Sequence, residues 1–167
     1  LLEESLKQFI MSRNLPMYKI MSYHLGWLDR NGDTEQSKLP IRNIGGLLLK
    51  FSRCISETKQ PNISLAVSTE LLSNFLQIHE DVKYANTSRN NRESIWWVWG
   101  PAQAINTGDG VHAMARVAIF EQENFDNDAL STKQILESLK ILDECVLTVC
   151  EGDYLENSFQ ERANVTV

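Results

Sequence analysis

The chain has 167 residues, and this length predicts a single domain with one buried core. Its formal net charge of −6 argues against a protein that binds nucleic acid or anionic membranes, because both partners require a positive field. No apolar run reaches the length of a signal peptide or a transmembrane segment, and the three cysteines lack metal-type spacing, so we expect a soluble cytoplasmic protein.

Two short helices are expected at the N-terminus, where apolar residues recur over 2–10 and 18–25 with a break near Pro16. His24 lies in the second of these helices. Because a catalytic histidine needs converging partners, we interpret His24 as structural rather than catalytic. Residues 29–40 are polar with Asn-Gly near the centre, and this composition predicts a loop.

A longer helix is predicted over residues 71–82, where apolar side chains recur at steps of three and four. Glu80 and Asp81 lie near its end. Residues 86–92 are turn formers that include Arg89, and three tryptophans follow closely. Carboxylates bind Mg²⁺, Mg²⁺ binds phosphate oxygens, and arginine binds the remaining oxygens. Acid on a helix followed by base on a loop therefore suits a metal-bound phosphate.

The remaining sequence also has helical periodicity. Residues 108–110 are expected to open a helix that continues with small and apolar side chains to Phe120. An acidic connection covers residues 125–130. Ser131, with Gln134 three residues later, has the spacing of a capping box and predicts the start of a long final helix. Because no run alternates convincingly between apolar and polar residues, as a β-strand would, the chain is predicted to be all-α.

The run from residue 79 to 109 resembles the first aspartate-rich region of the polyprenyl diphosphate synthases. Those trans-prenyltransferases carry H-D-D-x-x-D, then R-R-G-R-P-T and, in one branch, W-x-x-W-G-x-A-Q-A-I-N-x-G-D. The corresponding letters here are H-E-D-V-K-Y, R-N-N-R-E-S and W-W-V-W-G-P-A-Q-A-I-N-T-G-D. The resemblance implies an all-α isoprenoid-synthase-type bundle. Residues 1–167 would form one all-helical domain that corresponds to the N-terminal half of the family and is incomplete at the C-terminus.

The same resemblance implies the chemistry of the site. In the family, aspartates chelate Mg²⁺ ions that draw the diphosphate off an allylic substrate, and isopentenyl diphosphate attacks the resulting cation. Glu80 and Asp81 are therefore the implied catalytic metal ligands. Tyr84 replaces the third aspartate, and a neutral phenol is a poor ligand for Mg²⁺. Arg89 matches the arginine that grips the allylic diphosphate, whereas Asn90 replaces the arginine associated with isopentenyl diphosphate.

Two further substrate-binding residues are implied. The family's G-K-R-x-R-P aligns with residues 40–45, where only Arg42 survives, and Ser73 replaces the histidine of E-L-x-H. The family's C-E-G-Q-x-x-D corresponds to residues 150–156, with Asp153 in place of glutamine; a solvated acidic helix face is the alternative interpretation. Charge-assisted hydrogen bonds contribute roughly 1.5 to 3 kcal/mol each. Two lost cations thus weaken isopentenyl diphosphate binding by about 10²- to 10⁴-fold.

Three functions are compatible with these substitutions. The first is a Mg²⁺-dependent prenyltransferase that elongates or otherwise uses an allylic prenyl diphosphate. The second is a noncatalytic or regulatory subunit, a pseudoenzyme that partners an active synthase. The third is a terpene-synthase-like enzyme that ionises an allylic diphosphate without isopentenyl diphosphate. The resemblance also implies a homodimer, or a heterodimer with a related synthase.

Overall fold

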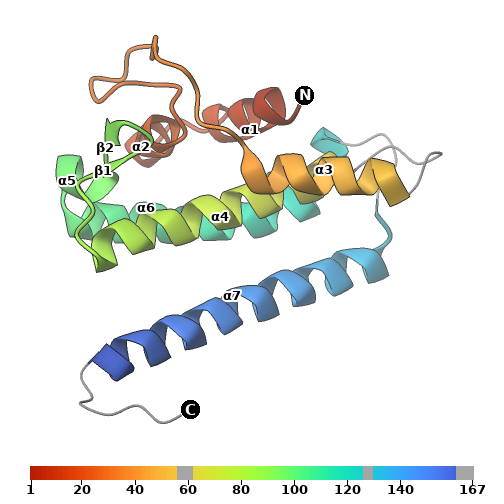
Figure 1. Cartoon of the computed structure of the whole chain (residues 1–167). Helices are drawn as coiled ribbons and strands as arrows, with labels where there is room; N and C mark the ends of the chain where they lie inside the picture. The colour runs from red at the N-terminus through yellow and green to blue at the C-terminus, as the bar shows by residue number, and fades with distance from the viewer. Residues whose placement is uncertain (56–61, 126–129, 161–167) are drawn as a thin grey trace. The chain divides into compact units, whose positions relative to one another are not determined.

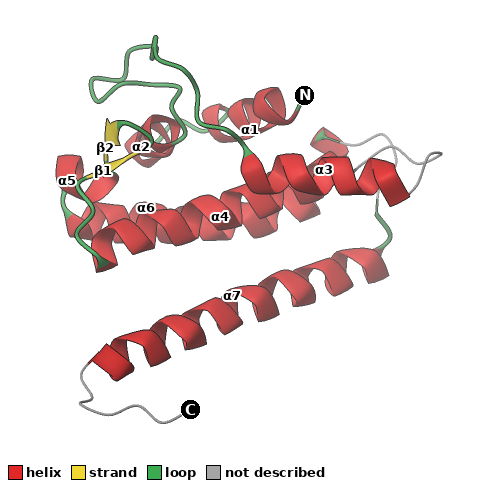
Figure 2. Cartoon of the chain, viewed as in Figure 1, coloured by secondary structure: helices red, strands yellow, loops and turns green. Residues whose placement is uncertain are grey.

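The computed structural model describes residues 1–55, 62–125 and 130–160, and most of its regular structure is helical (Figures 1 and 2). The chain forms two compact units, Leu1–Ala129 and Leu130–Val167. The predicted all-α class is confirmed, while the organisation as a single domain stays a prediction. Within the described ranges, no helix has the length and apolar character needed to cross a bilayer.

The first unit contains six α-helices and a short β-hairpin among its described residues. Its elements are α1 (Leu2–Met11), α2 (Pro16–His24), α3 (Asn43–Ile55), α4 (Ile63–Lys83), β1 (Ser88–Arg89), β2 (Arg92–Glu93), α5 (Ile95–Trp99), α6 (Pro101–Phe120) and a 3₁₀ turn at Gln122–Asn124. The second unit contains α7 (Thr132–Gln160).

Local sequence explains several helix boundaries. Pro16 opens α2 rather than interrupting a helix, because the first turn needs no N–H from this residue. The Asn62 side chain caps α4 by accepting the Leu65 N–H at 2.8 Å. In the second unit, Ser131 and Gln134 make the predicted capping-box hydrogen bonds, with the Ser131 N–H donating to Gln134 Oε1 at 3.0 Å.

The core of the first unit is built around α4 and α6, which lie side by side (Figure 1). The expectation that residues 108–110 open a helix is wrong, because α6 already begins at Pro101. Gly100 ends α5 with a φ of +84°. Gly108 instead lies in mid-helix, where a Cβ would collide with the His79 ring of α4. The glycine therefore allows the two helices to approach closely.

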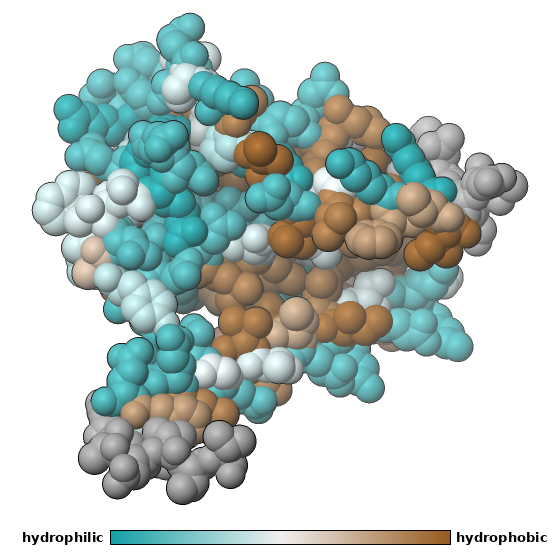
Figure 3. Space-filling model, in the orientation of Figure 1, coloured by the Kyte–Doolittle hydropathy of each residue, from teal (hydrophilic) through white to brown (hydrophobic). Residues whose placement is uncertain are grey.

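Helix α3 joins this pair through a second close approach, because a Cβ on Gly45 would collide with the Ala66 carbonyl oxygen of α4. The buried Glu70 carboxylate of α4 accepts hydrogen bonds from the N–H groups of Ile44 and Gly45 at 3.1 and 3.0 Å. It thereby provides acceptors for N–H groups in the first turn of α3, which have no acceptor within the helix. The other face of α3 exposes large apolar side chains, which form the brown area along this helix in Figure 3: Ile44, Leu47, Phe51 and Ile55.

Candidate functional site

The last turn of α4 brings two predicted metal ligands under one guanidinium. Arg89 Nε donates to both carboxylate oxygens of Asp81 at 2.9 and 3.0 Å. A terminal nitrogen of the same guanidinium lies 2.5 Å from Glu80 Oε2 and 2.7 Å from Asp81 Oδ1. The Asp81 side chain is only 3% exposed, whereas that of Glu80 is 49% exposed. The predicted residues Glu80, Asp81 and Arg89 therefore meet in one cluster.

The hydrogen bonds of this cluster favour the charged form of Arg89. Hydrogen bonds to Asp81 raise the pKa of the Arg89 guanidinium above its ordinary value, although burial acts in the opposite direction. Asn86 holds Asp81 from a second side, since its side-chain NH₂ donates to Asp81 Oδ1 at 3.3 Å and its N–H donates to the Asp81 carbonyl at 2.9 Å. The buried carboxylate is thus oriented before any ligand binds.

A tight β-hairpin carries Arg89 to the acidic pair. Its register pairs Ser88 with Glu93 and Arg89 with Arg92. Asn90 and Asn91 form the two-residue turn with φ of +53° and +61°, as a type I′ turn requires. Asn-Asn between two short runs is a hairpin signal, whereas the turn formers of residues 86–92 by themselves predicted only a turn.

The predicted substrate residue Arg42 lies in an internal network. Its guanidinium donates to both Glu3 carboxylate oxygens at 2.7 and 2.9 Å and to the Leu25 carbonyl at 2.6 Å, and its side chain is 8% exposed. Trp27 also donates to Glu3. Burial raises the pKa of Glu3, but the hydrogen bonds from Arg42 and Trp27 outweigh it and the pKa is lowered. These contacts give Arg42 a structural role, and its substrate role stays a prediction.

Three further positions predicted from the sequence, Tyr84, Ser73 and Asp153, take no part in the hydrogen bonds and ion pairs of the Arg89 cluster described above. Tyr84 is exposed at the C-terminal end of α4, with the Lys83 ammonium 4.5 Å from the centre of its ring. The Ser73 hydroxyl accepts a hydrogen bond from Gln77 at 3.2 Å. Asp153 lies in α7, in the second unit, and its substrate role also stays a prediction.

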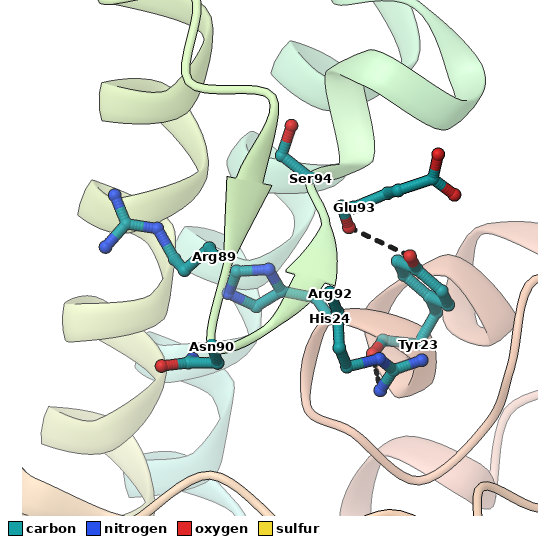
Figure 4. A pocket seen from close by; sticks show the side chains of 7 residues that line it. All are labelled: Tyr23, His24, Arg89, Asn90, Arg92, Glu93 and Ser94. Carbon is teal, nitrogen blue, oxygen red and sulfur yellow. Dashed lines mark hydrogen bonds between the residues drawn. The ribbon is translucent and has the colours of Figure 1, made fainter.

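A small cavity of about 10 Å³, enough for one water molecule, adjoins Arg89. Figure 4 shows its lining: Tyr23, His24, Arg89, Asn90, Arg92, Glu93 and Ser94. Burial lowers the pKa of His24 to about 3, and the nearby Arg89 and Arg42 charges add to this effect. His24 is therefore neutral at physiological pH, and within the described structure its Nε2 has no hydrogen-bond partner.

The acidic pair suits a Mg²⁺ ion that is shared with a substrate. Across the described ranges, no group of three or more His, Cys, Asp or Glu side chains is placed to hold a metal. Mg²⁺ is, however, commonly held by one or two carboxylates together with substrate phosphates and water. Glu80 and Asp81 provide that donor set, on the condition that Arg89 releases the oxygens it now occupies.

The fold defines the class of protein first. Polyprenyl synthetase from Streptomyces coelicolor A3(2) superposes with a TM-score of 0.82 at 25% identity, over 98% of this chain and 46% of that one. Geranylgeranyl pyrophosphate synthetase from Pyrococcus horikoshii Ot3 superposes with a TM-score of 0.78 at 19% identity, over 99% and 46%. The chain thus has the all-α isoprenoid-synthase fold.

Sequence comparison then gives the family. The polyprenyl synthetase family model matches residues 41–167, and the chain belongs to this family. A (2E,6E)-farnesyl diphosphate synthase from Mycobacterium tuberculosis is 24% identical over 100% of this chain and 44% of its own length. A geranylgeranyl diphosphate synthase from Methanosarcina mazei is 26% identical over 72% of this chain and 35% of its own length. The chain spans about half the length, or less, of these relatives.

Proposed function

We propose that this chain contributes an allylic diphosphate site of the prenyl diphosphate synthase type, in which Glu80 and Asp81 hold Mg²⁺ and Arg89 binds the diphosphate. The observation that carries the proposal is the convergence of one guanidinium on two carboxylates at the end of α4. The family is generally Mg²⁺-dependent, and two related enzymes are named as farnesyl and geranylgeranyl diphosphate synthases, which supports prenyl diphosphates as substrates.

The residues of the chain divide the work between them. Bound Mg²⁺ would neutralise the negative charge of the departing diphosphate. Asp81 would hold the ion with a carboxylate that is already oriented, because Asn86 donates hydrogen bonds to its side chain and to its carbonyl. Arg89 exchanges its carboxylate partners for diphosphate oxygens, which a planar guanidinium binds in bidentate fashion. His24 beside it is neutral, so Arg89 does not share the diphosphate with a charged imidazole.

Product analysis tests this function. The chain is incubated with Mg²⁺, farnesyl diphosphate and isotopically labelled isopentenyl diphosphate, alone and with a related synthase, and products are read by mass. We expect Mg²⁺-dependent consumption of the allylic substrate, and we expect Asp81→Ala to abolish it. Unchanged turnover in Asp81→Ala would refute the metal assignment. Product formed without isopentenyl diphosphate would instead identify the terpene-synthase-like chemistry.

A noncatalytic subunit is the second candidate, and the residues around the acidic pair favour it. Tyr84 stands where a third carboxylate would strengthen the metal site, and Arg89 already balances both remaining carboxylates. Under this proposal the chain lacks turnover alone and raises the activity of a partner synthase. Activity of the chain alone would exclude it.

Partners and location are proposed on separate grounds. A homodimer, or a heterodimer with a related synthase, would cover apolar side chains such as Ile44, Leu47, Phe51 and Ile55, which α3 exposes. Sedimentation of the chain with and without a related synthase tests this. A cytoplasmic location fits the three cysteines, all of which are free.

A further inference from the structure

The hairpin that carries Arg89 is held from two opposite sides. Its register places Arg89 directly across from Arg92, and like charges in that position repel each other. Figure 4 shows how the repulsion is relieved: the Arg89 side chain is directed toward α4, whereas the Arg92 side chain is directed toward Tyr23. Each arginine therefore fastens one side of the hairpin to a different part of the fold.

Arg92 attaches its side of the hairpin to two main-chain carbonyls and to one carboxylate. Its guanidinium donates to the Tyr23 carbonyl at 2.8 Å and to the Leu28 carbonyl at 2.6 Å. It also lies 3.3 Å from a Glu35 carboxylate oxygen and 4.2 Å from the centre of the Tyr23 ring. The Tyr23 hydroxyl adds a return bond to the Glu93 carbonyl at 2.8 Å. With its side chain only 13% exposed, Arg92 joins β2 to the end of α2 and the following loop.

Arg89 fastens the other side through acceptors that a ligand can remove. Its hydrogen bonds run to Glu80 and Asp81, which are the metal ligands of the proposed function. If Glu80 and Asp81 held a metal ion with those oxygens, β1 would lose this attachment to α4. A two-stranded hairpin has little stability by itself, so the remaining attachments decide where Arg89 stays.

We propose that Arg92 is a positioning residue, which holds the hairpin in place while Arg89 moves from the carboxylates to the diphosphate. This inference rests on the proposed function of the acidic pair. Arg92 touches neither metal nor substrate and acts only through Arg89. Loss of Arg92 therefore leaves the carboxylates intact and lets the diphosphate-binding guanidinium drift from its position.

A double-mutant cycle tests the proposal on the full chain. Isothermal titration measures binding of a thio-linked, non-ionising allylic diphosphate analogue at saturating Mg²⁺ to wild type, Arg92→Gln, Arg89→Gln and the double variant. Losing a residue that orients a ligand-binding group typically costs 10- to 100-fold, so we expect about a tenfold loss for Arg92→Gln. Because Arg92 acts through Arg89, the same change in the Arg89→Gln background should cost nothing further.

Two matched variants separate positioning from general damage. Arg30→Gln removes an exposed ion pair, 3.7 Å long, between Arg30 and Glu93 of the hairpin, and it should leave analogue binding unchanged. Tyr23→Phe removes only the hydroxyl bond to the Glu93 carbonyl and should weaken binding by about twofold to tenfold, which keeps the test available if Arg92→Gln fails to fold.

The outcomes are distinguishable. Equal losses from Arg92→Gln in the wild-type and Arg89→Gln backgrounds, or unchanged binding in both Arg92→Gln and Tyr23→Phe, would overturn the positioning role while the proposed function stands. If wild type itself fails to bind the analogue with Mg²⁺, the proposed function fails, and the positioning role fails with it.

Discussion

Replacing Arg89 with glutamine is expected to move two affinities in opposite directions. In the free protein, one nitrogen of the guanidinium lies 2.5 Å from Glu80 and 2.7 Å from Asp81. Mg²⁺ must displace the guanidinium before it can use both carboxylates, so the glutamine variant should bind Mg²⁺ alone more tightly. It also lacks the cation that binds diphosphate oxygens, so it should bind an allylic diphosphate more weakly in the presence of Mg²⁺.

The magnitudes follow from the exposure of each pair. Solvent screens the half-exposed Glu80, so its bond to Arg89 contributes little, and Asp81, at 3% exposure, carries most of the effect. One charge-assisted hydrogen bond of about 1.5 kcal/mol corresponds to roughly a tenfold gain in Mg²⁺ affinity. The variant also leaves a buried carboxylate without its cation, which should lower the free energy of unfolding by about 3 kcal/mol when no metal is present.

Calorimetry and thermal unfolding together check this prediction. Mg²⁺ is titrated alone, the unreactive allylic analogue is then titrated at saturating Mg²⁺, and the melting temperature is recorded with and without the ion. Arg30→Gln, which removes an exposed arginine near the same hairpin, is the control. An Arg89→Gln variant whose Mg²⁺ affinity is unchanged or weaker would show that the guanidinium and the ion do not compete for the carboxylates.

Three predictions concern the scaffold. Glu70→Ala removes the carboxylate that accepts hydrogen bonds from two N–H groups of α3. It should lower the free energy of unfolding, measured by urea denaturation, by about 1.5 to 3 kcal/mol. Gly108→Ala, which forces a Cβ onto the His79 ring, should cost about 1 to 3 kcal/mol, whereas Gly152→Ala in α7 meets nothing and should be neutral or stabilising. The pKa of His24 is lowered from 6.5 to about 3, so the unfolded chain takes up its proton first and stability falls as pH decreases from 6.5 toward 3. His24→Gln should remove about 2 kcal/mol of the stability difference between about pH 7 and pH 5, and an unchanged difference would contradict the burial of this imidazole.

Apolar periodicity and capping residues predicted much of the helical structure. Apolar spacing predicted the end of α4, and the Ser131 capping box is present. The start of α6 was missed because Gly108 and Gly110 resemble helix breakers. In the structure, a Cβ at Gly108 would collide with His79, and one at Gly110 would crowd Met17 and Met21. Such glycines serve packing between distant segments, which local sequence does not reveal.

At the site, too, contacts between residues close in sequence were predicted, whereas contacts between distant residues were not. The spacing of Glu80, Asp81 and Arg89 predicted a cluster, and they meet because a helix end and the adjoining hairpin are close in sequence. Arg42, in contrast, pairs with Glu3, which is 39 residues away. Arg92 gained no role from sequence, since it donates to carbonyls of α2 and the following loop, which leave no mark in a sequence, and its carboxylate partner Glu35 is distant along the chain.

The most direct test of the proposed site measures whether binding of an allylic diphosphate depends on Mg²⁺ and on Asp81. The unreactive analogue is titrated into wild type and into Asp81→Asn, each with Mg²⁺ and with chelator. We expect saturable binding by wild type with Mg²⁺, and a loss of that binding both in chelator and in Asp81→Asn. Equal binding by wild type in chelator, or by Asp81→Asn with Mg²⁺, would contradict the proposal that the acidic pair of α4 holds a metal-bound diphosphate.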